Sequence, residues 1–332
     1  MRVVFMGTPD FAVPILRAVA EAGHEILAVV TQPDRPGGRG MKLLPSPVKS
    51  EALQKGYQVL QPEKLDRETI AALSRMAPEV ITVAAFGQLL PEELLRVPKY
   101  GCLNVHPSLL PRHRGATPIQ QALLDGDVIT GVTIMVMEKA LDAGPIMLQK
   151  QSVIMSSDDA GSLGEHLSAA GGALLVEALQ LLAAGQAVCR RQDDSAATYC
   201  RKLKKEDALL DWNLPAEKLA RQVRAFNPHP GAYCFRGKER LKIRRAGLAS
   251  GLMWDAAPAQ AQGPVQVQAP AQVPDGACRP GQIVAVENEA LRVACGAGEL
   301  LLFEVQPAGR PLMSGAAYAR GRRLAPGDLL LP

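Results

Sequence analysis

The strongest constraint on the fold is the order of apolar segments in the first thirty residues. Residues 3–7 are typical of a buried strand, residues 11–22 carry apolar side chains at helical spacing, and residues 24–31 form a second apolar run. A strand, a helix and a second strand in this order predict a parallel sheet with right-handed crossovers. We therefore expect an α/β fold that opens with a Rossmann-like, mostly parallel sheet.

The loop after the first strand argues against a dinucleotide cofactor. Gly7-Thr8-Pro9-Asp10 occupies the place where nucleotide-binding folds carry G-x-G-x-x-G, and it lacks that spacing. A nicotinamide-dependent oxidoreductase, which the opening pattern alone would allow, is therefore not favoured.

Length and composition indicate a soluble protein of two domains. The chain has 332 residues, of which 47% are hydrophobic and 21% charged. We expect a Rossmann-like catalytic domain over residues 1–188, a basic linker without clear periodicity over 189–204, and a second domain over 205–332.

Short apolar segments in the second domain predict a small β-barrel. Three of them, at 281–286, 290–295 and 299–305, are separated by turns at regular spacing. Residues 256–277 are rich in Ala, Pro, Gln and Gly and carry almost no charge, so we expect a mobile insertion there.

Cysteine spacing and apolar runs bear on the cellular compartment. The six cysteines show no C-x-x-C spacing, which argues against a zinc site and favours reduced thiols. Pro9 and Asp10 interrupt the apolar N-terminus before a signal-peptide core could form. The apolar run 169–184 carries Glu177 and Gln180, so no stretch is expected to reach the length of a membrane span. A cytoplasmic monomer is expected.

Positive charge is concentrated in one block of the chain. Residues 201–245 hold thirteen Lys or Arg and five acidic residues, a balance of +8 in a chain whose net charge is +4. Strand alternation over 240–246 places Arg240, Lys242 and Arg244 on one side of that segment. Such a block favours a polyanionic partner, although an ordinary solvated face has the same composition.

A second basic segment lies near the N-terminus. Residues 32–50 contain Arg35, Arg39, Lys42 and Lys49 among glycines and prolines. This composition predicts a flexible loop with neither a helix nor a strand.

The candidate chemistry lies on a strand that two prolines then interrupt. Alternation along the strand makes Asn104 and His106 point the same way, so both could donate to a developing oxyanion. An ordinary hydrogen-bonded turn has the same residue types. Asp142 follows the alternating strand 130–138, and we expect it at the carboxyl edge of the sheet, where open α/β sheets place their sites.

A known pattern covers these residues. Asn-x-His-x-Ser-Leu-Leu-Pro-x-x-Arg-Gly, from Asn104 to Gly115, followed by Leu-Asp-Ala-Gly-Pro-Ile around Asp142, resembles the folate-dependent formyltransferases. The resemblance implies that Asn104, His106 and Asp142 form the catalytic constellation. The segments KLKKEDALLDW, VRAFNPHPGAY, LKIRRA and LLFEVQPAGRPLM resemble the methionyl-tRNA formyltransferases in particular.

The resemblance also implies the substrates, with no metal. The formyl donor would be 10-formyltetrahydrofolate, and the acceptor would be the α-amino group of initiator methionyl-tRNA. Asp142 would either orient His106 or take the proton of the amine. The second domain would be OB-like, and residues 32–50 would reach into the acceptor stem of the tRNA.

Two sets of binding residues follow from the same resemblance. The folate would be bordered by Phe86, Gly87, Gln88, Leu89, Ser108, Leu109, Leu110 and Pro111. The tRNA would be held by Arg35, Arg39, Lys42, Lys49, Arg201, Lys202, Lys204, Lys205, Arg240, Lys242 and Arg244. Two alternatives stay open, namely a folate-dependent formyltransferase or hydrolase with a small-molecule acceptor, and a non-catalytic RNA-binding protein on the same fold.

Overall fold

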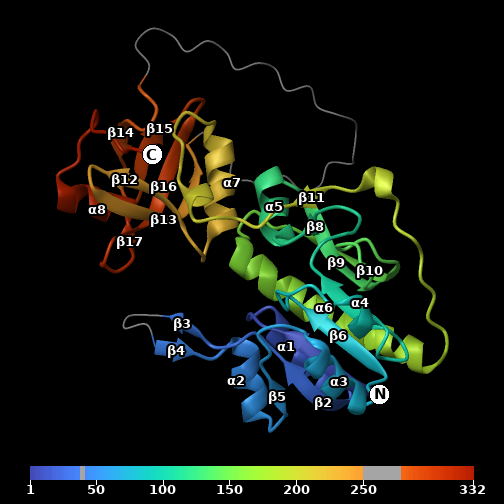
Figure 1. Cartoon of the computed structure of the whole chain (residues 1–332). Helices are drawn as coiled ribbons and strands as arrows, with labels where there is room; N and C mark the ends of the chain where they lie inside the picture. The colour runs from blue at the N-terminus through green and yellow to red at the C-terminus, as the bar shows by residue number, and fades with distance from the viewer. Residues whose placement is uncertain (38–41, 250–277) are drawn as a thin grey trace. The chain divides into compact units, whose positions relative to one another are not determined.

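The computed structural model of the chain describes residues 1–37, 42–249 and 278–332 (Figure 1). Arg39 and the expected insertion at 256–277 therefore lie outside the described residues, as does the side chain of Lys42. The chain divides into two compact units. The first unit comprises Met1–Pro118, Ile129–Val153 and Gly164–Arg201, and the second comprises Ile119–Val128, Ile154–Leu163 and Lys202–Pro332.

The first unit is built on a seven-stranded sheet with the order β10-β9-β7-β6-β1-β2-β5. Its strands are β1 (Arg2–Gly7), β2 (Glu25–Val30), β5 (Val59–Leu60), β6 (Val80–Ala84), β7 (Cys102–His106), β9 (Ile129–Val136) and β10 (Ile146–Val153). The first five run parallel, whereas β9 is antiparallel to β7 and to β10. The expected Rossmann-like, mostly parallel sheet is confirmed.

Helices cover both faces of this sheet. Its apolar strands bury both sets of alternating side chains, as central parallel strands do. On one face Val4, Met6 and Ile81 form a core with Leu73, which belongs to α3. The helices of the first unit are α1 (Ala12–Glu21), α2 (Pro47–Gln54), α3 (Arg67–Arg75), α4 (Glu92–Leu95), the first residue of α5 (Pro118–Asp125) and most of α6 (Ala160–Ala183). The Asp66 carboxylate accepts from the Thr69 amide at 2.9 Å and so caps the N-terminus of α3.

A glycine pair brings α6 against the opposite face. A Cβ on Gly171 would lie 2.7 Å from Val105 Cγ1, and one on Gly172 would lie 2.9 Å from the Ala18 Cβ of α1. Val105 of β7 therefore points toward α6. Because side chains alternate along a strand, Asn104 and His106 point to the other face, as the sequence predicts.

Helix α6 corrects one expectation from the sequence. With 24 residues it is long and apolar enough, by length and composition alone, to cross a membrane. Its side chains Leu167, Leu175 and Leu179 are fully buried within the fold. These leucines act as part of the core.

The expectation that residues 32–50 hold neither helix nor strand was wrong. Strands β3 (Arg35–Gly37) and β4 (Lys42–Leu44) pair antiparallel, and helix α2 follows. Ser46 is extended and its hydroxyl accepts from the Lys49 amide at 3.0 Å, while Pro47 takes the first helical position. This Ser-Pro start signal outweighs the turn-forming composition around it.

The segment expected as a linker is structured where it precedes Lys202. It contains a 3₁₀ turn at Asp194–Ala196 and strand β11 (Tyr199–Cys200), which pairs parallel with β8 (Arg114–Gly115). Arg190 also exchanges two backbone hydrogen bonds with Ile146, at 2.8 and 2.9 Å. These partners are far away in sequence, so no local periodicity could have shown them.

The second unit is a closed antiparallel barrel, which confirms the expected C-terminal β domain. Its sheet has the order β12-β13-β16-β15-β14, and β17 pairs with β16. Its elements are α7 (Ala216–Phe226), β12 (Ala232–Arg236), β13 (Glu239–Leu248), β14 (Ile283–Val286), β15 (Leu291–Ala294), β16 (Glu299–Pro307), β17 (Met313–Ser314), α8 (Gly315–Arg322) and a 3₁₀ turn at Glu206–Ala208, together with residues 119–125 of α5 and 160–163 of α6. Bridges from Phe235 to Leu331 and from Gln282 to Leu329 join the two outer strands. Residues 329–331 thereby close the sheet.

Candidate active site

Asn104 and His106 stand at the end of β7, on the face opposite α6. His106 is 4% exposed, whereas Asn104 is half-buried. The hydrogen bonds of the described residues leave the Asn104 carboxamide without a protein partner. A carboxamide in this state can donate to a ligand oxygen without first breaking a bond to the protein.

The hydrogen bond of His106 fixes its tautomer. Its Nε2 lies 3.0 Å from the carbonyl oxygen of His113, and a carbonyl only accepts, so Nε2 carries the proton and donates. Burial lowers the pKa of His106 below its ordinary value, and the nearby Asp142 carboxylate only partly opposes this effect. The ring is therefore neutral at pH 7, and Nδ1 is a free acceptor.

Asp142 faces the unprotonated Nδ1 of His106. Its Oδ2 lies 3.8 Å from His106 Nδ1, which is too long for a hydrogen bond, and accepts from the Gly115 amide at 2.9 Å. Asp142 is 9% exposed and has φ 50°, a left-handed conformation that costs a non-glycine residue about 1–3 kcal/mol. Two acceptor atoms thus face each other across 3.8 Å with no hydrogen bond between them.

The reason given for placing Asp142 at the sheet edge was wrong. Strand β9 is antiparallel to β7, so its last residue Val136 pairs with Leu103 near the start of β7. Asp142 approaches His106 because the loop after β9 folds back. A Cβ on Gly144 would lie 1.8 Å from the Val136 carbonyl oxygen, so only glycine allows this close return.

Two residues to which sequence reasoning gave no role hold the Asp142 loop. The Gln192 amide donates to the carbonyl oxygens of Asp142 and Gly144, at 2.8 Å each. Arg114, which is 2% exposed, donates to Gln192 Oε1 from Nε at 3.0 Å and from Nη2 at 2.8 Å. Gln192 lies 50 positions beyond Asp142, so only the folded chain reveals the contact.

The predicted folate residues 86–89 follow β6, beside the end of β1. The Thr8 hydroxyl donates to the Phe86 carbonyl at 2.9 Å, which joins the two strand ends. In this sheet β2 and β6 flank β1, so the chain order reverses here, as it does at the ligand crevices of open α/β sheets. Phe86 is buried, whereas Leu89 is 78% exposed. The Gln88 amide donates to the carbonyl oxygens of Pro62 and Glu63.

The predicted folate residues 108–111 divide into two kinds. Ser108 is fully buried and its hydroxyl donates to the Arg112 carbonyl at 2.6 Å, and Leu110 packs in a small apolar cluster. Those two side chains stabilise the loop itself. Leu109 and Pro111 are half-buried and remain open to a ligand.

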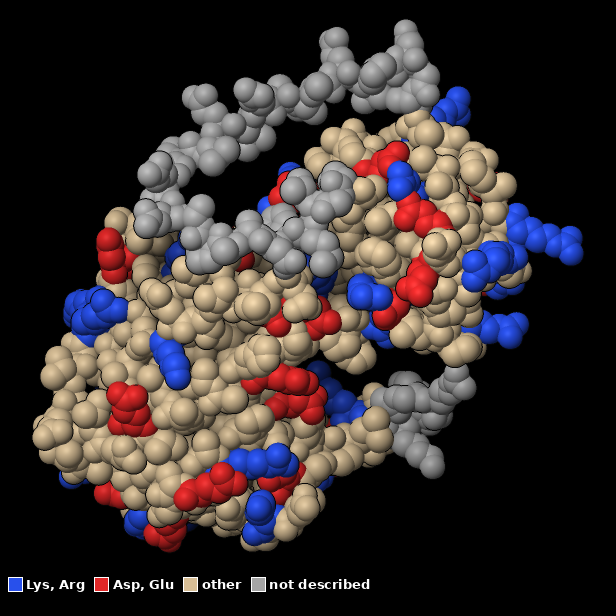
Figure 2. All heavy atoms as spheres, turned by 180° about the vertical axis from the view of Figure 1, so that it is seen from behind, with Lys and Arg blue, Asp and Glu red and all other residues tan. Residues whose placement is uncertain are grey.

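The predicted tRNA residues of the barrel and of α2 already have protein partners. Lys49 forms an ion pair with Asp34 at 2.6 Å. Arg240 lies 3.7 Å from the centre of the Tyr233 ring, and Lys242 and Arg244 donate to backbone carbonyls. The exposed members of the set are Arg35, Arg201, Lys202, Lys204 and Lys205. Figure 2 shows further Lys and Arg side chains projecting from one edge of the second unit, at the upper right of that view.

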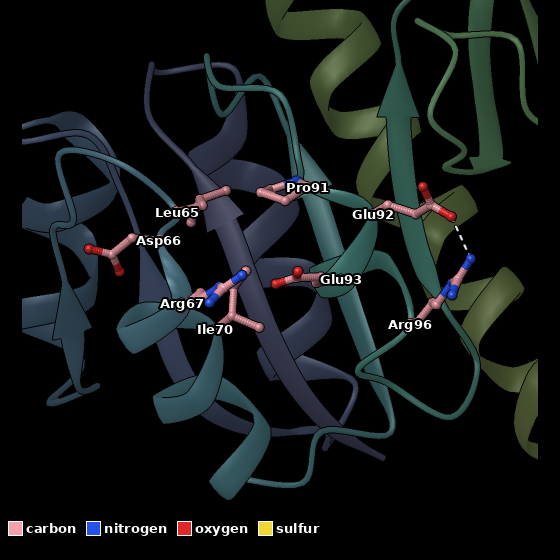
Figure 3. A pocket seen from close by; sticks show the side chains of 8 residues that line it. All are labelled: Leu65, Asp66, Arg67, Ile70, Pro91, Glu92, Glu93 and Arg96. Atoms are coloured by element: carbon pink, nitrogen blue, oxygen red, sulfur yellow. Dashed lines mark hydrogen bonds and ion pairs between the residues drawn. The ribbon is translucent and has the colours of Figure 1, made fainter.

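Two surface hollows are lined by residues other than the predicted catalytic ones. One, of about 670 Å³, belongs to the first unit, where Glu92 pairs with Arg96 and Arg67 and Glu93 point toward one another (Figure 3). The other, of about 700 Å³, belongs to the second unit and is lined in part by Arg244. Neither contains a predicted catalytic or folate-binding residue. Over residues 1–37, 42–249 and 278–332, no group of three or more His, Cys, Asp or Glu could hold a metal ion.

Curated relatives match the chain over its whole length. The methionyl-tRNA formyltransferase of Thiobacillus denitrificans is 46% identical over 331 residues, covering 99% of each chain. The enzyme of the same name from Moorella thermoacetica is 45% identical with the same coverage, and that of Bacillus subtilis is 45% identical, covering 99% of this chain and 97% of its own.

Solved structures share the fold at low identity. HypX from Aquifex aeolicus has a TM-score of 0.63 and 17% identity, covering 99% of this chain, which spans 48% of HypX. An N-formyltransferase from Helicobacter canadensis, in complex with folinic acid and dTDP-3-aminofucose, has a TM-score of 0.61 and 16% identity, covering 91% of this chain and 98% of its own.

Family matches divide the chain in two. Residues 1–179 match the formyl transferase family and residues 202–323 match the formyl transferase C-terminal domain. With the motif from Asn104 to Gly115 and the Asp142 loop brought together in one site, the chain belongs to the formyl transferase family.

Proposed function

We propose that this enzyme transfers the formyl group of 10-formyltetrahydrofolate to the α-amino group of initiator methionyl-tRNA. The observation that carries the proposal is the arrangement of His106 Nδ1 and Asp142 Oδ2, two acceptors 3.8 Å apart beside an unengaged Asn104 carboxamide. Relatives that are 45–46% identical along their whole length and are named methionyl-tRNA formyltransferase support the choice of acceptor.

The facing acceptors suit a nucleophile that carries more than one hydrogen. A neutral primary amine can donate one N–H to His106 Nδ1 and another to Asp142 Oδ2, which orients its lone pair toward the formyl carbon. As the new C–N bond forms, His106 takes a proton from the nitrogen, because its lowered pKa keeps the ring neutral and ready to accept. Asp142 then stabilises the imidazolium.

Asn104 supplies the donor for the developing oxyanion. Its carboxamide is half-buried and unengaged, so it can donate to the formyl oxygen as that oxygen becomes negative. The Nε2–H of His106 already donates to the His113 carbonyl and is not free for this role. Collapse of the intermediate breaks the bond between the formyl carbon and N10, and N10 receives the proton that His106 took from the amine, leaving formylmethionyl-tRNA, tetrahydrofolate and a neutral His106.

Exposed cations of the 201–205 segment are proposed to contact the tRNA backbone. Lys204 and Lys205 are exposed, whereas Lys49, Lys242 and Arg244 are engaged with the protein. Phosphate contacts of this kind position a nucleic acid but do not read its sequence. Every group that this scheme uses belongs to one chain, so we propose that the enzyme acts as a monomer. We also propose that it acts in the cytoplasm.

The test is transfer of labelled formyl from 10-formyltetrahydrofolate to initiator methionyl-tRNA, with elongator methionyl-tRNA as the competing acceptor. We expect rapid transfer to the initiator, loss of transfer in His106→Ala, and normal transfer in His166→Ala, which changes an exposed histidine. If folate binds and no tRNA is formylated, the acceptor assignment is wrong, and amino sugars become the next acceptors to test. Unchanged transfer in His106→Ala would refute the role of that residue.

A further inference from the structure

Gln192 contacts the Asp142 loop, and the scheme above gives it no role. We infer that Gln192 is a positioning residue, which holds Asp142 in the geometry that the transfer reaction needs. The inference rests on the proposed function for the reaction it serves, but its structural part can be measured without that reaction.

The contacts of Gln192 act on the backbone of the Asp142 turn. Its Nε2 donates to the carbonyl oxygens of Asp142 and Gly144, each at 2.8 Å. These carbonyls lie outside the β9–β10 ladder, and Asp142 has φ 50°, a conformation that is strained for a non-glycine residue and that a further hold from its surroundings stabilises. Two donations to carbonyls two residues apart supply that hold.

Arg114 fixes the orientation of the Gln192 amide. Its Nε and Nη2 both donate to Gln192 Oε1, so the amide nitrogen must point to the loop. Its Nη2 also donates to Asp194 Oδ1 at 2.7 Å, and the guanidinium is almost fully buried. The orientation of Gln192 is thus set by a buried cation with further partners of its own.

The chain then closes a ring of contacts around Asp142. Arg114 reaches the Asp142 backbone through Gln192, while the next residue, Gly115, donates its amide to Asp142 Oδ2 at 2.9 Å. The backbone and the carboxylate of Asp142 are therefore fixed from the same short strand, β8. Asp142 Oδ2 lies 3.8 Å from His106 Nδ1, and displacing the turn would move the carboxylate away from that ring.

A purely structural role would show itself differently. Gln192 is only half-buried, so truncating it leaves little empty volume in the core. Reacting groups, in contrast, lose about 10²-fold in rate for a displacement of about 1 Å. The expected signature is a fall in kcat with a folded protein and an unchanged KM for the formyl donor.

The experiment compares Gln192→Glu and Gln192→Ala with the matched pair Gln186→Glu and Gln186→Ala. Glutamate at position 192 still offers an oxygen to Arg114 but has no N–H to donate to the Asp142 loop. Alanine removes the hydrogen bonds to Arg114 and to the loop. Gln186 is an exposed glutamine on the same segment. We expect kcat for formyl transfer to fall by about 10- to 100-fold in both Gln192 variants, and to stay unchanged in both Gln186 variants.

Hydrogen exchange of the Gly115 amide is the second readout. That amide donates to Asp142 Oδ2, so its exchange should speed up in the Gln192 variants while the amides of β7 stay protected. Unchanged exchange at Gly115 would overturn the inference, even if kcat falls. Faster exchange with an unchanged kcat would overturn it as well. If the wild-type protein formylates no tRNA, the proposed function fails, and the Gly115 exchange alone decides whether Gln192 holds Asp142.

Discussion

Replacing Gly115 with alanine tests the close packing of β8 against β11. Gly115 has φ 124°, and a Cβ there would lie 2.1 Å from the Cys200 carbonyl oxygen. That oxygen belongs to the backbone of β11, so it cannot rotate away as a side chain could. The strands must separate locally, and the Gly115 amide must leave Asp142 Oδ2, to which it donates at 2.9 Å.

The expected loss of stability has two contributions. Overpacking of a tight site costs about 1–3 kcal/mol, and a side chain held at positive φ costs about 1–3 kcal/mol. Gly115→Ala should therefore lower the free energy of unfolding by about 2–6 kcal/mol. Gly56→Ala is the matched control, because Gly56 has φ 74° and nothing within 4 Å of its Cβ position. It should lose only about 1–3 kcal/mol.

Urea unfolding and formyl transfer measure the two consequences separately. Gly56→Ala should transfer formyl at the wild-type rate per folded molecule, while Gly115→Ala should be slower even where it is fully folded. If Gly115→Ala loses no more stability than Gly56→Ala, the close approach to Cys200 is refuted. If it is destabilised and keeps its full rate, the amide of Gly115 does not position Asp142.

Three further predictions follow from the site and the basic segment. Asn104→Ala should lower kcat by about 10²–10³-fold as one oxyanion donor is lost, and a KM effect without a kcat effect in steady-state transfer would contradict this role. Burial lowers the pKa of His106 from its ordinary value of 6.5, so the unfolded chain binds the proton before the folded protein does as the pH falls. The free energy of unfolding measured in urea should therefore decrease below about pH 6.5. His106→Asn should make that drop smaller, and an identical drop would show that other groups cause it. Lys204→Ala and Lys205→Ala should each reduce the salt dependence of tRNA binding by about one unit of the log–log slope, and an unchanged slope would remove these residues from the interface.

The parallel core was predictable because each of its strands is recognisable from its own run of apolar residues. The apolar runs that became β1 and β6 are buried on both faces, so they are continuous in the sequence. The shared direction of Asn104 and His106 also follows from local alternation. Strand β10 was not expected, because it is an edge strand whose middle, Gln149 to Gln151, is polar and partly exposed.

The remainder of the site depends on contacts that no local pattern encodes. Asp142 was found through resemblance to a family, and the reasoning that placed it at a parallel edge failed because β9 runs antiparallel to β7. Gln192 and Arg114 meet across 78 positions. Arg114 belongs to the family motif, but nothing in the polar segment around Gln192 marks that residue as its partner. The Ser46-Pro47 start of α2 was a readable signal that the glycines and prolines around it obscured.

The way the barrel closes has a consequence for how the second unit forms during synthesis. Among the described residues, the segment 327–331 bonds to both β12 and β14, and it comes after every other strand of the barrel in chain order. Until the ribosome has made those residues, both outer strands present unpaired backbone groups to their surroundings. A nascent chain in this state can pair with another strand edge, so the interval before closure is when this unit is most exposed to misassembly and has most need of a chaperone.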